Sequence, residues 1–178
     1  GIYMLTGSGG NLGLAVGADA VFLIDDQYAP LTPKIQAAVA AITAKPVQFL
    51  LNTHWHGDHT GGNEKLAEAG ALIVAHDNVR RRMSTEQFLA FFNMRVEPSP
   101  KRALPLVTFG TDVTFHINGD EVTALHCPAA HTDGDAIVHL DLHPDNVILT
   151  AAGPMTIDWS NVAVGDPLPD VMTTWMVL

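Results

Sequence analysis

The sequence predicts an α/β fold in which sheets and helices form packed layers. Short apolar runs of strand length alternate with helix-like segments along most of the chain, and Gly-rich turns separate the first runs. The chain has 178 residues, 47% of them hydrophobic, which is enough to bury a core. We therefore expect one domain spanning residues 1–178.

The first part of the chain predicts three strands, a helix and a fourth strand. Residues 3–6, 12–16 and 20–25 are the expected strands, and the glycines of 7–10 favour a hairpin turn. Thr32 as N-cap and Pro33 in the first turn open an amphipathic helix. The apolar run 47–51 then predicts a buried strand.

Further strands are expected at residues 71–75, 113–117, 121–125, 136–142 and 146–150. Asn118-Gly119 between two of these runs is a strong hairpin signal. Ser84 to Gln87 has the capping-box form and predicts a helix bearing Phe88, Leu89, Phe91 and Phe92. These aromatic side chains fit either the core or the wall of a substrate pocket.

The most informative segment is His54-Trp55-His56-Gly57-Asp58-His59, directly after the apolar run 47–51. Imidazole and carboxylate groups are the side chains that hold Zn²⁺ and related ions. Gly57, Gly61 and Gly62 would allow positive φ and close backbone approach in a compact loop, and Asn63 would cap the following helix. This spacing predicts a metal site, with room for two ions.

Composition excludes several classes of protein. Nine basic against nineteen acidic residues argue against nucleic-acid binding, and the absence of a run of 18 apolar residues argues against a membrane span. Cys127 is the single cysteine, so an internal disulfide is excluded. No signal segment opens the chain, and the compartment stays open between periplasm and cytoplasm.

The pattern H-x-H-x-D-H after a strand, with His131-Thr132-Asp133-Gly134-Asp135 downstream, resembles the metallo-β-lactamase superfamily of hydrolases. The resemblance implies an αβ/βα four-layer sandwich with metals at one edge. It also implies that His54, His56 and His131 bind a first metal, and that Asp58 and His59 bind a second. Asp25 is similar to the family residue that supports the metal loop without binding, and we expect Asp25 and Gly57 to give the site its structural support.

The resemblance further implies one or two zinc ions per chain and a hydroxide that attacks an amide or ester-type bond. Zinc lowers the pKa of water to about 7, and Asp58 would orient the nucleophile as the catalytic residue. β-Lactam hydrolysis is the favoured activity, with a small molecule as substrate. Thioester or lactone hydrolysis, or a degenerate non-catalytic metal-binding domain, are the alternatives.

The C-terminal part departs from the family pattern. Ala151-Ala152 stands where a bridging Asp is expected, so Asp166 is the remaining candidate for that ligand. No histidine follows His143, and residues 151–178 form a divergent tail. We therefore expect an incomplete C-terminal half and a homo-oligomer that completes the fold.

Other residues fit ordinary roles better than metal binding. His76 suits a cap or hydrogen bond, and His116 and His126 suit packed or surface positions. A solvent-exposed strand face suits His139, Asp141 and His143. Cys127 precedes His131 and fits buried structure. For Trp55, packing under the loop and lining the pocket are equally open.

Overall fold

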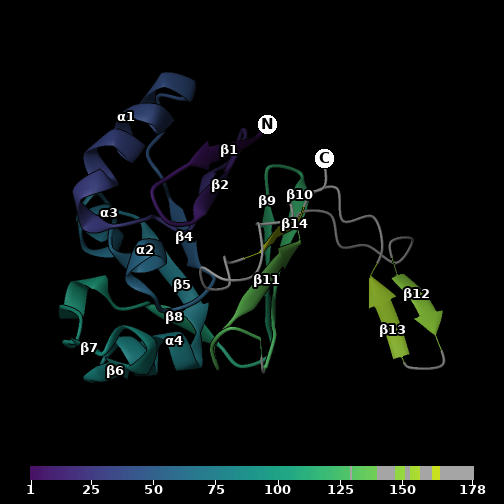
Figure 1. The fold of residues 1–178 in the computed structure, drawn as a ribbon. Helices are drawn as coiled ribbons and strands as arrows, with labels where there is room; N and C mark the ends of the chain where they lie inside the picture. Colours follow the sequence, from purple (N-terminus) through teal and green to yellow (C-terminus); the bar gives the residue numbers. More distant parts are fainter. Residues whose placement is uncertain (129, 140–146, 151–152, 157–161, 165–178) are drawn as a thin grey trace.

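In the computed structural model, the described residues are 1–128, 130–139, 147–150, 153–156 and 162–164 (Figure 1). Asp166 and most of the tail 151–178 therefore lie outside the described part, as do Asp141 and His143. No helix in the described ranges is long and apolar enough to cross a membrane.

A six-stranded sheet forms the first half, in the order β1-β2-β3-β4-β5-β8. The strands are β1 (Ile2–Thr6), β2 (Asn11–Val16), β3 (Val21–Ile24), β4 (Phe49–Asn52), β5 (Leu72–His76) and β8 (Val107–Phe109). β1 to β3 pair antiparallel, whereas β3, β4, β5 and β8 run parallel. Because the carboxyl ends of the parallel strands meet at one edge, Asp25, Thr53 and Asp77 follow their strands at the same edge.

Helices cover one face of this sheet, as Figure 1 shows for α1 and α3. The helical segments of the first half are η1 (Ala29–Leu31), α1 (Thr32–Ile42), α2 (Gly57–Thr60), α3 (Asn63–Glu68), α4 (Asp77–Met83) and η3 (Lys101–Ala103). Ile35 and Val39 of α1 and Leu66 of α3 pack on Leu23 and Leu50 of the sheet. The four-residue spacing of Ile35 and Val39 places both on the buried side of α1.

A second sheet has the order β14-β11-β10-β9. Its strands are β9 (Asp112–Ile117), β10 (Asp120–His126), β11 (Ala136–His139) and β14 (Val162–Val164). Phe22 of the first sheet meets Phe115 of the second edge-to-face at 4.8 Å, inside a core that also includes Val74, Ala124 and Val138. The helices, the first sheet and the second sheet thus stack as three layers. Separately, β12 (Val147–Thr150) pairs with β13 (Gly153–Thr156) in a hairpin.

The predicted helix after Ser84 is wrong. Ser84 Oγ and Thr85 Oγ1 donate hydrogen bonds back to the carbonyls of Arg80 and Arg81, at 2.6 and 3.2 Å, so they end α4 and do not start a new helix. The chain continues as a hairpin of β6 (Gln87–Leu89), η2 (Ala90–Phe92) and β7 (Met94–Val96). Its large apolar side chains are exposed rather than packed in a core, namely Phe88, Phe91, Phe92 and Met94.

Two predicted helix caps are also wrong. Thr32 lies inside the first turn of α1, with Leu31 as N-cap, although Pro33 does stand in the first turn as expected. Asn63 is the first residue of α3, and its side chain turns inward instead of capping the helix. Thr32 Oγ1 donates to the nearby carbonyl of Ala29 at 3.0 Å, whereas the Asn63 side chain bonds to the distant Asn52.

The Asn118-Gly119 turn is confirmed, with φ of 58° and 84° at the two residues. It also joins the two sheets. Asn118 Oδ1 accepts hydrogen bonds from the backbone N–H groups of Asp19 and Ala20, both at 3.0 Å, and Asn118 Nδ2 donates to the carbonyl of Ala20. The hairpin of the second sheet is thereby fastened to the turn that precedes β3.

Candidate metal centre

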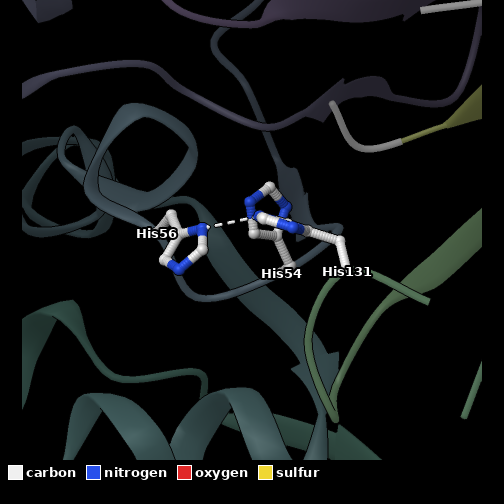
Figure 2. Close-up of side chains that lie close together, drawn as sticks. All are labelled: His54, His56 and His131. Carbon is white, nitrogen blue, oxygen red and sulfur yellow. Dashed lines mark hydrogen bonds between the residues drawn. The ribbon is translucent and has the colours of Figure 1, made fainter. Parts of the chain in front are cut away.

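Three of the predicted ligands converge at the edge of the first sheet, where Figure 2 shows His54, His56 and His131 facing one another. One ligand atom from each imidazole lies within 4.8 Å of the others, so the group could hold a metal ion. His54 and His56 follow β4, whereas His131 comes from the loop between β10 and β11. His131 Nε2 and His56 Nδ1 are 2.9 Å apart and share a hydrogen bond.

The environment keeps two of these imidazoles neutral at pH 7. Burial lowers the pKa of His54 well below its usual value, and the nearby imidazoles lower it further. For His56, burial and then His131 lower the pKa to about 4, against a smaller opposing effect of Asp58. A neutral imidazole offers a free lone pair, which is the form that binds a metal.

Asp25 organises the loop that carries these residues. Its Oδ1 accepts from the Thr53 N–H at 2.7 Å, and its Oδ2 accepts from Thr53 Oγ1 at 2.6 Å and from His59 Nδ1 at 2.7 Å. Since the single hydroxyl proton of Thr53 goes to Asp25, Thr53 Oγ1 accepts the 3.2 Å bond from His54 Nδ1. His54 and His59 therefore both carry their proton on Nδ1 and leave Nε2 for a metal.

Asp58 and His59, the other predicted pair, lie together on α2. Asp58 Oδ2 is 3.5 Å from His59 Nε2, and His59 is buried while the Asp58 side chain keeps 26% of its exposure. The ring of His59 is 4.1 Å from that of His54, centroid to centroid. The two groups of predicted ligands are thus adjacent, and together they supply the nitrogen and oxygen atoms that zinc prefers.

The turn between β1 and β2 lies against this second pair. A Cβ added to Gly9 would be 2.7 Å from Asp58 Cβ, and one added to Gly10 would be 2.5 Å from Cε1 and 2.9 Å from Nε2 of His59. Only glycine leaves room beside these ligand atoms. The donor set, an imidazole beside a carboxylate, fits a divalent ion.

A buried network of asparagine side chains holds the backbone of the metal loop. The sequence analysis did not predict this network. Asn52 and Asn63 exchange two amide hydrogen bonds, at 3.0 and 2.9 Å. Asn52 Nδ2 also donates to the carbonyl of His59, and Asn63 Nδ2 donates to the carbonyl of Ala103. Eleven positions separate the two asparagines, and no local pattern in the sequence marks them as partners.

Asp26 belongs to the same buried region. It is fully buried, and burial raises its pKa well above the usual value, against the hydrogen bond from the Gly62 N–H. The nearby Asp25 raises the pKa of Asp26 further. Asp26 also donates its backbone N–H to the carbonyl of His59 at 3.1 Å, so two neighbouring aspartates both hold the α2 segment.

The glycines of the motif differ from the prediction. None of Gly57, Gly61 and Gly62 has positive φ. A Cβ at Gly57 would meet nothing within 4 Å, so its predicted supporting role has no steric basis. At Gly61, however, a Cβ would be 2.6 Å from the backbone nitrogen of Ala29, which confirms a close backbone approach.

The other histidines of the described residues lie outside the cluster. His76 is the N-cap of α4, accepting the Asn78 N–H on Nδ1, and its ring stacks on His126 at 3.6 Å. His116 is exposed on β9. His139, expected on an exposed face, is fully buried, because the second sheet encloses this position on β11.

Trp55 packs beneath the loop against the small cluster of Ala75, Val79, Met83 and Ala103. Cys127 is half-buried, and burial raises the pKa of its thiol, which suits a structural role. The proposed bridging residue Asp166 lies outside the described residues.

Comparisons with known proteins agree with this geometry. The family model of the metallo-beta-lactamase superfamily matches residues 5–151. A hydroxyacylglutathione hydrolase from Anaeromyxobacter dehalogenans (strain 2CP-C) is 36% identical over 96 residues, covering 49% of this chain and 36% of that protein.

Solved structures share the fold at low sequence identity. A metallo-beta-lactamase with a HARLDQ motif from Cronobacter sakazakii has a TM-score of 0.71 at 18% identity, covering 96% of this chain and 61% of that one. BJP-1, a subclass B3 metallo-beta-lactamase of Bradyrhizobium japonicum, has a TM-score of 0.65 at 18% identity, covering 86% and 56%. The chain thus spans between about one third and three fifths of the length of these relatives.

Fold and site together define an α/β sandwich protein with a histidine cluster at the sheet edge. The chain belongs to the metallo-beta-lactamase superfamily, whose model covers most of its length. The predicted α/β fold class is confirmed.

Proposed function

We propose that this chain carries the metal-binding part of a zinc-dependent hydrolase that cleaves an amide or ester-type bond. The observation that supports this most is the convergence of His54, His56 and His131, with Asp58 and His59 adjacent. Burial keeps two of these imidazoles neutral at pH 7, ready to bind without first losing a proton.

Each residue has a distinct part in the proposed centre. His54, His56 and His131 would hold the first ion, and Asp58 with His59 would contribute to a second. When bound, zinc supplies Lewis acidity, which acidifies water and polarises a carbonyl. Asp25 orients His54 through Thr53 and His59 directly, and the partly exposed carboxylate of Asp58 would accept a proton from the nucleophile.

Two substrate classes are in question. The similarity to a hydroxyacylglutathione hydrolase, 36% identical over 96 residues, favours a thioester as substrate. The β-lactam expectation rests on the resemblance of the motif and on a fold shared at about 18% identity. Both bonds suit the same acyl-transfer chemistry, so the proposed centre serves either.

The test combines metal content with turnover. Zinc per chain would be measured by elemental analysis, and hydrolysis of a glutathione thioester and of a chromogenic cephalosporin would be followed for the wild type and Asp58→Asn. Asp120→Asn, on the exposed end of β10, is the matched control. Asp58-dependent turnover of one substrate would support the proposal and select the class.

Bound zinc with no turnover of either substrate would instead favour the degenerate metal-binding domain. Absence of zinc would contradict the proposed centre itself. The expected homo-oligomer stays a prediction, which the mass from light scattering would test.

A further inference from the structure

His131 is the one clustered histidine that the first sheet does not supply. It comes from the loop of residues 127–135, of which residue 129 is outside the described part. Asp135 fixes the internal shape of this loop, because its Oδ2 accepts the N–H groups of His131 and Thr132 and its Oδ1 accepts Thr132 Oγ1. These bonds do not set where the loop lies relative to His54 and His56.

Helix α4 supplies one external attachment of the loop. Two others are the Ala136 N–H, which donates to the carbonyl of Thr53 at 2.9 Å, and His126 Nε2, which lies 3.1 Å from the carbonyl of Asp133. Asn78 Nδ2 donates to the carbonyl of Asp133 at 2.5 Å. Arg82 donates two hydrogen bonds to the Asp133 carboxylate, from Nε to Oδ1 at 3.2 Å and from Nη2 to Oδ2 at 3.0 Å. Gly134 is buried against the helix, since a Cβ there would be 3.0 Å from the backbone nitrogen of Val79. The residues two and three positions after His131 are therefore docked on α4.

The same helix is fixed to the other two ligands. Val79 and Met83 point from α4 into the cluster that Trp55 packs against, and Trp55 stands between His54 and His56 in the chain. The Trp55 ring is 4.5 Å from that of His56, centroid to centroid. Helix α4 thus contacts the loop of His54 and His56 through its apolar side. It contacts the loop of His131 through Asn78 and Arg82.

We propose that Asn78 and Arg82 are positioning residues, which set His131 against His54 and His56 and thereby tune the affinity of the first metal position. This inference rests on the proposed function. The ion pair is about half exposed, with 44% of Arg82 and 42% of Asp133 accessible, so it contributes little to stability by itself. Its effect is on the placement of the loop, where outer contacts commonly change metal affinity about 10- to 100-fold.

The experiment measures zinc affinity by competition with a chromophoric chelator, beside the melting temperature of the metal-free protein. The variants are Asn78→Ala, Asp133→Ala and Arg82→Gln, with the exchanged pair Arg82→Asp and Asp133→Arg as the rescue. Arg95→Gln is the matched control, because Arg95 makes an exposed 2.6 Å ion pair with Glu86 away from the loop. Asp133→Ala also leaves the bonds between Arg82 and Gln87 in place.

We expect each single variant to weaken zinc binding about tenfold or more, with an unchanged melting temperature of the metal-free protein. The exchanged pair should recover most of the affinity, and Arg95→Gln should behave as the wild type. Unchanged affinity in all three variants would overturn the proposal. The proposal would also be overturned if the single variants lowered both the zinc affinity and the melting temperature of the metal-free protein, and the exchanged pair restored neither.

A second measurement separates this proposal from the proposed function. The ring nitrogen signals of His131 in the metal-free protein report its hydrogen bond with His56. Asp133→Ala should shift these signals if α4 positions the loop, and unchanged signals would overturn that role. Failure of the wild type to bind zinc would count against the proposed centre, while the nitrogen signals still decide the positioning.

Discussion

Among single residues, Asp25 shapes the centre most directly. It has the left-handed φ of 59°, which costs of order 1 kcal/mol or more for a residue other than glycine. In that conformation its carboxylate reaches Thr53 and His59, 28 and 34 positions along the chain. The strand before Asp25 could be predicted from its apolar run, but the reach of the carboxylate could not, because its partners are distant in sequence.

Gly10 gives a residue-scale prediction. Gly10→Ala should displace the His59 ring, which Asp25 holds on its other side, and should lower zinc bound at the second position. The measurement is zinc per chain by elemental analysis. Gly57→Ala is the control, since a Cβ there meets nothing within 4 Å. Equal zinc content in the two variants would show that the β1–β2 turn has no influence on the site.

His76 gives a prediction for pH. Burial lowers the pKa of His76 below 6.5, so in acid the unfolded chain binds a proton more readily than the folded chain. The contribution of His76 to the free energy of unfolding is therefore fully present above pH 6.5 and is lost as the pH falls below it. His76→Asn keeps a capping oxygen for Asn78 but cannot titrate in this range.

Chemical denaturation of the metal-free protein between pH 7 and pH 5 would measure this. The loss of unfolding free energy on acidification should be smaller in His76→Asn than in the wild type. Asn93→Gly, which removes no titrating group, serves as control and should keep the wild-type slope. The same loss in both variants would contradict the assignment to His76.

At the level of elements, local signals predicted turns well and helix starts poorly. Asn118-Gly119 was predictable because a tight hairpin needs two residues that tolerate positive φ. The helix after Ser84 was wrong because the same Ser-x-x-Gln pattern can end the helix before it. The aromatic spacing at Phe88, Phe91 and Phe92 then looked helical, although the hairpin exposes these side chains.

The Asn118 turn gives an element-scale prediction. Asn118→Gly keeps the left-handed backbone but removes the hydrogen bonds to Asp19 and Ala20. We expect the free energy of unfolding to fall by about 1–3 kcal/mol, measured by urea denaturation. Asn93→Gly is the control, because Asn93 has φ of 47° and no described residue hydrogen-bonds its side chain. A similar change in both variants would mean that the side-chain bonds contribute nothing.

At the level of the whole molecule, the motif at His54–His59 and the distant His131 were enough to predict the fold class and the cluster. The order of strands, the burial of His139 and the docking of α4 on Asp133 were not predictable. These features depend on which surfaces meet after folding, and a single sequence shows no pairing between residues so far apart. Asp166 lies outside the described residues, so its proposed role stays a prediction.

Zinc binding gives a prediction for the whole molecule. Added zinc should stabilise the wild type by about 2.7 kcal/mol when free zinc exceeds the dissociation constant 100-fold. The rise in melting temperature would be measured by scanning calorimetry. His131→Ala should abolish most of the rise, whereas His116→Ala should retain it because that side chain is exposed. A full rise in His131→Ala would exclude His131 from the site.

The hydrogen bond between His56 and His131 spans 75 positions of the chain and joins loops of different sheets. An ion shared by these two side chains would act as a removable cross-link, closing a long loop much as a disulfide does. Closing it would reduce the freedom of the unfolded chain. The ion would have to leave before the two loops could separate, so a chelator should make the protein unfold faster.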